Sequence, residues 1–344
     1  MAQTNVDVIK AVLDADTNLA TQLAGIAPEN YADVYQALTD RTGATTPLMN
    51  EFLSVLVNKI IVQRIIDPLN FNNPFSVFMR EIEPFGDVDE YISVDATEGA
   101  DYNETANPFT VNKGPAYVFH MYTKYRRVWS ISFSFEILRA AFMKEYELTA
   151  MIDQYTKKMR DRLEIEIYTQ AIEDLATGDW GANQVVQLPK INTTDIDAWS
   201  KTAYTKILET ANKASTYGTW MMNEKYTKMN GNIPLGSAYL FLYAGGKTNF
   251  DVSVMASLLN SAQIGSQKYF KEVRVITDPE GRNDSTTIAG YILKPDSYII
   301  RPRIDNVTSI FNPANLINTN FLHNWRKQGI NYLEPAIKLT FATA

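Results

Sequence analysis

The sequence EIEPFGDVDEYISVDATEGADYNETANPFTVN, residues 81–112, carries nine carboxylates and not one Lys or Arg. Its glycines and prolines are too frequent for a helix, whereas residues 89–95 have the composition of a short strand. The stretch therefore predicts an extended, two-stranded acidic loop. Because such a loop cannot fold back on itself without repulsion, we expect a protein that reaches a copy of itself rather than a catalyst.

The residues that follow this loop alternate between large and polar side chains. From Tyr117 to Phe135 the odd positions are mostly aromatic or apolar, and the even positions include His120, Lys124 and Arg126. This period of two predicts one strand of about 19 residues, or roughly 60 Å, several times the usual strand length. Such a strand is typical of a protruding β-arm or of a sheet that spans a whole subunit.

Residues 145–176 contain no Pro or Gly and predict one long helix. Apolar side chains recur at spacings of three and four residues from Leu148 to Leu175, the opposite side is charged, and Gly178 lies just beyond the predicted end. At 1.5 Å per residue this helix would be about 48 Å long. A helix of that length, solvated on one side, predicts the backbone of a domain.

The remaining segments predict N-terminal helices and an α/β lobe. Helical patterns cover residues 6–18, residues 28–41 and a stretch that begins after Pro47, and residues 178–200 are loop-like. Between 201 and 301, helices at 204–215 and 252–259 alternate with strands at 238–243, 273–277, 287–293 and 298–301. The pattern predicts a compact α/β domain, followed after Pro302 by further strands.

Composition excludes several kinds of chemistry. The 344 residues include no cysteine, which rules out disulfides, thiolate metal sites and cysteine nucleophiles, and the two histidines, His120 and His323, are too scattered to favour a metal site. A net charge of −7 is unsuited to tight phosphate binding, so any DNA would be contained rather than gripped. No apolar run approaches the ~20 residues of a membrane helix. We expect no catalytic residue, no cofactor, no metal and no membrane association.

Two motifs allow a purely structural interpretation as well as a chemical one. The sequence AGGKT at 244–248 lacks the first glycine of a phosphate loop, because Phe241 occupies that position, so a turn after a strand is favoured. The acidic run lacks the ligand spacing and central glycine of a calcium loop, which favours solvated or interface charge over a metal site. A carboxylate-dependent hydrolase stays an alternative, since 39 acidic residues always supply candidate pairs, although no pair stands out.

The charges of the long helix allow two interpretations. They can form i, i+4 pairs along the helix, or the basic ones can receive the acidic loop of a neighbouring copy. Exposed ion pairs are worth only about 0–1 kcal/mol each, but repeated symmetric contacts can fix orientation and register. The second interpretation makes eight residues intersubunit contacts: Asp87, Asp89, Glu90, Asp95, Lys157, Lys158, Arg160 and Arg162.

The order of these segments resembles the Hong Kong 97 fold of tailed-phage major capsid proteins. The local sequence is most similar to the capsid proteins of small short-tailed (podoviral) phages with protein-primed genomes, over residues 50–145 and more moderately over 239–280 and 320–341. The similarity lies in NEFL (50–53), LVNKII (56–61), NNPF (72–75), EPFG (83–86), YI (91–92), DAT (95–97), DYNE (101–104), LRAAF (138–142), FDVSV (250–254), LNS (259–261) and FKEVRVI (270–276).

The resemblance implies an α+β Hong Kong 97-type fold with five parts. These are an N-terminal arm with helices (1–80), an extended loop (81–116), a peripheral domain with the spine helix (117–199), an α/β axial domain (200–301) and returning strands of the peripheral domain (302–344). In that arrangement the loop 84–115 would lie over the spine helix of an adjacent subunit, while the lobe 200–300 would pack around the capsomer axis.

The resemblance also implies a function and partners. The chain would be a non-enzymatic major capsid protein that self-assembles as hexamers and pentamers into an icosahedral or prolate shell around double-stranded phage DNA, without sequence-specific DNA binding. A separate scaffolding protein and a portal protein would take part, with assembly in the host cytoplasm and residence in the virion capsid. The alternatives are an encapsulin-like nanocompartment shell with a protein cargo, the hydrolase, and a monomeric binding module.

Overall fold

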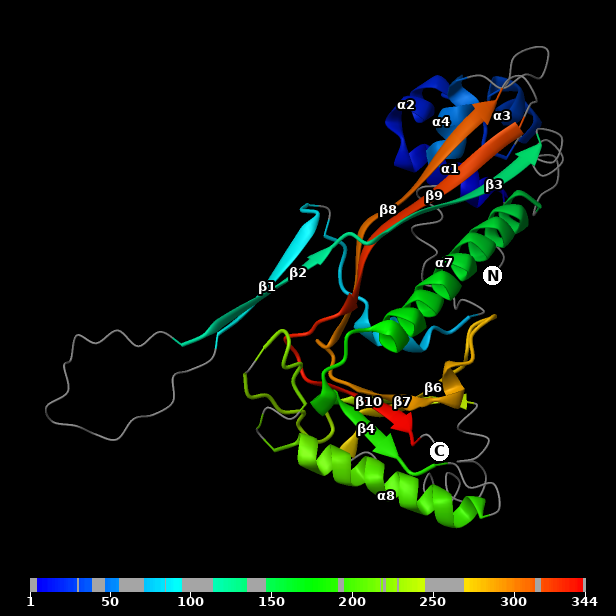
Figure 1. Cartoon of the computed structure of the whole chain (residues 1–344). Coiled ribbons are helices and arrows are strands. Elements are labelled where there is room, and N and C mark those ends of the chain that lie inside the picture. The colour runs from blue at the N-terminus through cyan, green and yellow to red at the C-terminus, as the bar shows by residue number, and fades with distance from the viewer. Residues whose placement is uncertain are drawn as a thin grey trace, which may run out of the picture.

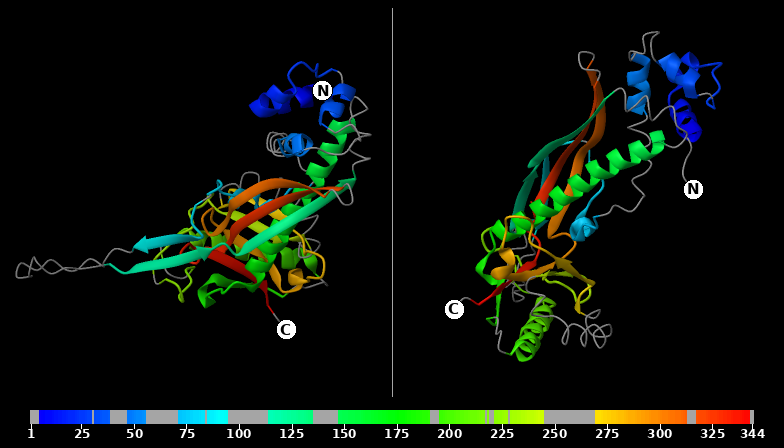
Figure 2. Two further views of the ribbon diagram at one scale, coloured as in Figure 1. Left: turned by 90° about the horizontal axis from the view of Figure 1, so that it is seen from above. Right: turned by 90° about the vertical axis from the view of Figure 1, so that its right-hand side faces the viewer.

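The computed structural model describes residues 5–29, 31–38, 47–55, 71–83, 85–94, 114–134, 147–190, 195–216, 218, 221–227, 229–244, 269–312 and 317–342. This part of the chain is elongated, with N-terminal helices at one end, a five-stranded sheet at the other, and a long helix beside a three-stranded sheet between them (Figure 1). A two-stranded hairpin projects sideways from the middle of the molecule (Figures 1 and 2).

The three-stranded sheet is antiparallel, with strand order β3-β9-β8. Its strands are β3 (Tyr125–Ser134), β8 (Tyr298–Asn312) and β9 (Ile317–Ile330). Trp129 and Leu322 belong to the core shared with the long helix, whereas Val128 and Ile310 on the opposite face are 55% and 60% exposed. The strand predicted at 298–301 is thus only the first part of a longer strand, which continues through the segment predicted to return.

The alternating segment 117–135 forms two strands, so the prediction of a single long strand is wrong. β2 (Ala116–Tyr122) pairs with β1 (Val88–Val94), whereas β3 pairs with β9, and the chain changes sheet at Thr123 and Lys124. The backbone N–H of Thr123 donates to the Asp87 carbonyl at 3.1 Å, and Lys124 turns to Asp174 on the long helix at 2.5 Å. The alternation of large and polar side chains continues across this break, because the odd-numbered residues of both β2 and β3 face the body of the molecule.

The predicted spine helix is confirmed as α7 (Glu147–Thr177). Every third or fourth residue in its C-terminal half is buried: Met159, Leu163, Ile167, Ala171 and Leu175. These residues pack under the three-stranded sheet, as predicted from their spacing. The helix ends before Gly178, where a Cβ would lie 2.4 Å from Ile330 Cδ1 and 2.8 Å from the Asp174 carbonyl oxygen. Only glycine fits this close approach between the helix end and β9.

The five-stranded sheet has strand order β4-β10-β7-β5-β6, with β4 and β6 parallel to their neighbours and β7 antiparallel to both of its own. Its strands are β4 (Val185–Leu188), β5 (Tyr239–Tyr243), β6 (Glu272–Ile276), β7 (Ile288–Leu293) and β10 (Ala336–Phe341). Along β5, Phe241 faces the core under α7, and Leu240 and Leu242 face α8 (Ile196–Ala214). The lobe predicted from residue 201 is therefore an α/β unit.

Two parts of this lobe differ from the prediction or lie outside the described residues. Residues 178–200, predicted as a loop, include β4 and the first turn of α8, whose N-cap Asp195 accepts a hydrogen bond from the Ala198 N–H at 3.0 Å. Four residues of strand and a cap are too short a signal for periodicity to reveal. The helix predicted at 252–259 lies outside the described residues.

A short 3₁₀ helix, η3 (Pro74–Phe78), joins the two sheets to α7. Phe75 stacks on Phe241 of β5 at 4.8 Å between ring centroids, and the Asn73 amide donates to Glu164 of α7 at 3.0 Å. Aromatic pairs of this geometry add about 0.5–1.5 kcal/mol beyond the area they bury. The NNPF sequence at 72–75 thus packs between the two sheets.

The N-terminal helices pack around a small core of their own at the far end of β8 and α7 (Figure 1). They are α1 (Asn5–Ala15), α2 (Thr17–Gln22), α3 (Tyr31–Leu38) and α4 (Pro47–Val55). The helix predicted at 6–18 is interrupted at Asp16, whose carboxylate caps α2 by accepting from the Asn18 N–H at 2.9 Å. An N-cap preference competes with continuous helix at such a residue.

Candidate intersubunit surface at the arm and its base

β1 and β2 form the projecting hairpin, which we call the arm (Figure 1). Its antiparallel register runs from Val88 opposite Tyr122 at the base to Val94 opposite Ala116 at the outer end. The strand predicted at 89–95 is confirmed as β1, one residue earlier, and its partner is the first part of the alternating segment. At about 3.3 Å per residue the paired strands extend roughly 23 Å.

One face of the arm is turned to solvent. Alternate residues of both strands are exposed, and the register places them opposite one another on the same face. Five large apolar side chains there are between 42% and 64% exposed: Val88, Ile92, Val94, Val118 and Tyr122. A contiguous apolar row on a projecting element indicates a surface that another protein covers.

Asp89 binds the arm to the three-stranded sheet. Its carboxylate accepts hydrogen bonds from Lys327 of β9 and, at 3.0 Å, from Arg301 of β8. Arg301 also donates to Glu83 at 2.6 Å. The Lys327 side chain is 1% exposed and that of Asp89 10% exposed, so water hardly screens this pair.

Asp87 makes a second, more exposed attachment beside the first. It accepts from Arg303 of β8 and lies 3.5 Å from the Arg126 guanidinium of β3. The two guanidiniums flank the Trp325 ring, with 5.1 Å from Arg126 Cζ and 6.0 Å from Arg303 Cζ to its centroid. Ring and carboxylate together hold both cations in place.

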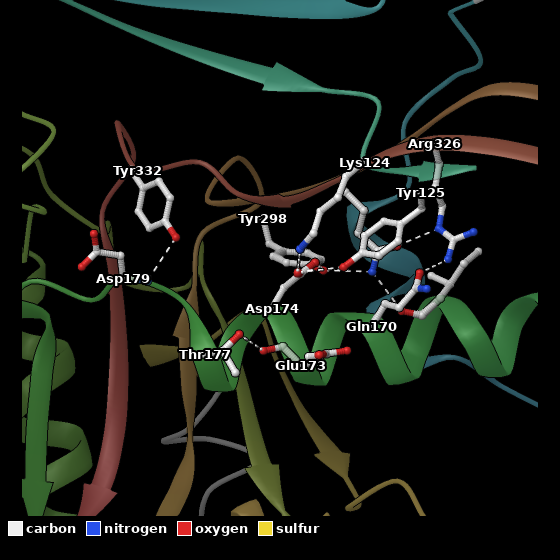
Figure 3. Close-up of polar contacts among 12 residues, drawn as sticks. Lys124, Tyr125, Gln170, Glu173, Asp174, Thr177, Asp179, Tyr298, Arg326 and Tyr332 are labelled. Atoms are coloured by element: carbon white, nitrogen blue, oxygen red, sulfur yellow. Dashed lines mark hydrogen bonds and ion pairs between the residues drawn. The ribbon is translucent and has the colours of Figure 1, made fainter. Parts of the chain in front are cut away.

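An aromatic group attaches β2 to the body of the molecule. Tyr226 and Tyr332 stack with ring centroids 4.4 Å apart, and Phe119 of β2 meets Tyr332 edge-on at 5.6 Å. The Tyr332 hydroxyl accepts from the Asp179 N–H at 3.2 Å (Figure 3). Burial raises the pKa of Tyr332, so this hydroxyl is neutral at ordinary pH.

Asp174, near the C-terminal end of α7, accepts hydrogen bonds from three side chains where the arm meets the body (Figure 3). Lys124 donates at 2.5 Å, the Tyr125 hydroxyl at 2.9 Å and the Tyr298 hydroxyl at 3.2 Å. Burial raises the pKa of Asp174, and the hydrogen bonds from these donors oppose that rise. Burial by itself would lower the pKa of Lys124, but its hydrogen bonds to Asp174 and Tyr125 raise it overall.

A cleft of about 520 Å³ lies between the arm and the C-terminal end of α7. Its lining includes both apolar and charged side chains, namely Phe119, Met121, Lys124, Asp174, Asp179, Ile330 and Tyr332. Asp174 and Asp179 are each bound by a lysine, Lys124 and Lys225. In the ranges that the structure describes, no group of three or more His, Asp or Glu side chains is placed to hold a metal ion. The cleft therefore offers apolar contact and paired charge.

The residues predicted as intersubunit contacts separate into engaged and exposed ones. Asp87 and Asp89 are bound within the chain, and Arg160 of α7 pairs with Asp305 of β8 at 2.6 Å, both about 15% exposed. Glu90 is exposed on the arm, and Asp95 lies outside the described residues. Lys157, Lys158 and Arg162 are exposed on α7 and have no ion pair within the described ranges.

The cations that hold Asp87 and Asp89 were not predicted from the sequence. Arg126 stands out only as one of the even-numbered polar residues of the alternating segment, and nothing singles out Arg301, Arg303 or Lys327. A signal for them does exist, because RPR at 301–303 and RK at 326–327 place charges inside segments that otherwise read as buried strands. Charged residues in such strands need partners, but the sequence does not say which ones.

Comparison with known proteins agrees with this architecture. The family model described as Phi29-like phage major capsid protein matches residues 12–340. A chain in the capsid structure of Staphylococcus phage Andhra is 9% identical, with a TM-score of 0.59 over 81% of this chain and 86% of that chain. A chain in the capsid structure of cyanophage P-SCSP1u is 11% identical, with a TM-score of 0.53 over 82% and 91%.

A third similar chain comes from the structure of the head fiber and inner core protein gp22 of bacteriophage P68, with 12% identity and a TM-score of 0.56 over 80% of this chain and 88% of that chain. No curated protein matches the sequence. At such low identities these structures show a shared fold. None of the helices in the described ranges is long and apolar enough to cross a membrane.

Proposed function

Because the chain belongs to the Phi29-like phage major capsid proteins, it is a shell-forming structural protein with a Hong Kong 97-like fold, and we propose that its shell encloses double-stranded phage DNA. The shell is icosahedral or prolate and built from hexamers and pentamers. Its partners are a scaffolding protein during assembly in the host cytoplasm and a portal protein. The DNA is enclosed without sequence-specific binding, in keeping with a net charge of −7.

The proposed mode of assembly rests on the exposed apolar face of the arm. A monomer that exposed Ile92 at 61%, Val94 at 64% and Val118 at 47% on a projecting hairpin would carry an aggregation liability. In a shell, a neighbouring subunit covers this face. The axial lobe then lies around the capsomer axis, and the arm crosses to the adjacent subunit.

Charge supports a direction for that crossing. On the arm Glu90 is exposed, and the sequence beyond β1 adds Asp95, Glu98, Asp101 and Glu104. On α7, Lys157, Lys158 and Arg162 are exposed. The arm of one subunit therefore lies over α7 of the next, with Glu90 and Asp95 as the proposed partners of these cations. Asp87, Asp89 and Arg160 have no such role, because partners within the chain already hold them.

The test places a charge on the arm's exposed face. We expect wild-type protein, expressed with its scaffolding protein, to give uniform closed shells in negative stain. We expect Val88→Asp with Val118→Asp, two positions that do not face each other across the strands, to give unassembled protein of unchanged Tm. The Tm should hold because both side chains are exposed in the free chain. Val118→Thr, which keeps shape without adding charge, serves as the matched control and should still assemble.

Closed shells from the double aspartate variant would show that the arm's face is not a contact. Isolated particles of wild-type protein under all conditions would contradict the shell itself. Nuclease-protected DNA in shells from infected cells separates a phage capsid from a nanocompartment, whose content would be protein. The carboxylate-dependent hydrolase is not favoured, because the family match is to phage major capsid proteins.

A further inference from the structure

Two consecutive basic residues of β9 are almost fully buried and point in opposite directions. Arg326 is 0% exposed and Lys327 1% exposed. Arg326 donates to Gln170 of α7 (Figure 3). It also donates to Asn324 at 2.9 Å and to Gln328 at 2.8 Å. Lys327 reaches out on the other face of the sheet to Asp89 of the arm. Neighbouring residues of a strand alternate between faces, so β9 is tied to α7 on one side and to the arm on the other.

The attachments of the arm differ in how strictly they define its direction. The contact of Phe119 with Tyr226 and Tyr332 is aromatic and tolerates sliding of the rings. The pair of Asp87 with Arg303 is solvent-exposed, and such pairs hold geometry weakly. The pair of Asp89 with Lys327 is shielded from water, so its charges can be satisfied only in one arrangement.

We infer that Lys327 is the positioning residue of the arm: by ion-pairing with Asp89 it sets the direction in which the arm leaves the body. A buried ion pair adds little net stability, because desolvation offsets its attraction, but it penalises every arrangement that separates the charges. The arm leaves the body through only Thr123 and Lys124 on the β2 side, so without the pair it can pivot there. This property belongs to the single chain and does not depend on the proposed function.

Replacing the pair by apolar side chains separates direction from stability. In Lys327→Met with Asp89→Leu no buried charge is left unpaired, because Arg301 keeps Glu83 at 2.6 Å. We expect a Tm equal to or above that of the wild type and an arm that samples several directions. Asp89→Leu alone should lower the Tm, because it leaves the Lys327 ammonium buried without its partner.

The chain has no cysteine, which allows two spin labels to be placed without further changes. Ala116→Cys on the arm and Ser130→Cys on β3 are both exposed positions. Double electron–electron resonance on unassembled full-length protein should give a narrow distance distribution with the pair intact. In the Lys327→Met, Asp89→Leu background the distribution should widen by about twofold or more.

A matched control removes another buried ion pair, which joins β8 of the same sheet to α7. Arg160→Met with Asp305→Leu takes away a pair with similar burial that does not touch the arm, and the distribution should stay narrow. An unchanged narrow distribution in folded Lys327→Met, Asp89→Leu protein would overturn the inference, as would equal widening in the control. If the double variant fails to fold, Asp89→Asn is measured instead, where widening supports the inference and an unchanged distribution overturns it.

Discussion

At the scale of single residues, Asp174 shows how burial and hydrogen bonding oppose each other. Burial raises the pKa of this carboxyl above its ordinary 3.8, while Lys124, Tyr125 and Tyr298 stabilise its charged form. A raised pKa means that the folded chain binds the proton more tightly than the unfolded chain. This tighter proton binding stabilises the folded state. The stabilisation is fully present below pH 3.8 and is lost as the pH rises through the folded-state pKa of Asp174.

Asp174→Asn should therefore reduce the change of the free energy of unfolding with pH. As the pH rises above 3.8, the wild type should lose stability relative to this variant, because the Asp174 carboxyl loses its proton whereas the amide does not titrate. Urea unfolding at several pH values measures the difference. Asp179→Asn is the control of opposite sign, since its hydrogen bond from Lys225 lowers the pKa of Asp179. Parallel profiles for wild type and Asp174→Asn would contradict the assignment.

The same scale shows why the counter-charges of the arm could not be predicted from the sequence. The acidic composition predicted contacts with a neighbouring subunit, whereas the described contacts of Asp87 and Asp89 are ion pairs within the chain. It did not identify partners, because Asp89 meets Arg301 and Lys327 at separations of 212 and 238 residues. The nearest long run of cations in sequence terms was the spine helix, which holds neither Asp87 nor Asp89 within the chain.

At the scale of elements, the pairing of β5 with β7 depends on one missing side chain. Gly290 lies opposite Leu242, and a Cβ built there would be 2.0 Å from the Phe241 carbonyl oxygen. The obstacle is backbone in the middle of the sheet and cannot rotate away. Gly290→Ala should destabilise the lobe by more than about 3 kcal/mol, detected as a large fall in Tm and in soluble yield.

Gly281→Ala is the comparison for this substitution. Gly281 has φ +82° and open space around its Cβ position, so alanine there meets only backbone strain of about 1 kcal/mol. Similar Tm values for the two variants would show that the sheet yields at Gly290. The contrast isolates the close approach of the two strands from the general effect of replacing glycine.

Elements differ in how well periodicity predicts them. The spine helix was predicted within two residues at each end, because its apolar stripe runs without Pro or Gly until Gly178. The prediction of one long strand was wrong because the inward-facing residues are odd-numbered in both β2 and β3. The two strands are separated at Thr123 and Lys124, which bind Asp87 and Asp174, and neither contact can be read from the sequence.

At the scale of the whole molecule, a charge reversal tests where the arm of a neighbour lies. Glu90→Lys leaves Asp87 and Asp89 with their partners within the chain, so the monomer should keep its Tm. We expect closed shells to fall by about tenfold or to become irregular, because the lysine would face the cations of a neighbouring α7. Negative-stain counts and sedimentation measure the yield.

The reciprocal change should partly restore assembly. Lys157→Glu with Arg162→Glu gives the Glu90→Lys arm an acidic surface to meet, whereas the same two changes in a wild-type arm background should impair assembly. Normal shells from Glu90→Lys protein would contradict the electrostatic contact. Failure of the reciprocal change to rescue would place the partner of Glu90 elsewhere on the neighbour.

The overall order of the parts followed from sequence, but their connections in space did not. An α/β lobe and returning strands were expected, and both occur. The last strand was not expected to enter the lobe. β10 joins the five-stranded sheet between β4 and β7, although it follows β9 of the other sheet directly in sequence.

This position of β10 has a consequence for synthesis on the ribosome. Among the strands that the structure describes, β4 pairs only with β10, and β10 is made about 150 residues later. The sheet cannot close until residues 336–341 have emerged, so a nascent or prematurely ended chain has no finished lobe. Translation must therefore reach this C-terminal strand before β4 can pair and the five-stranded sheet is complete.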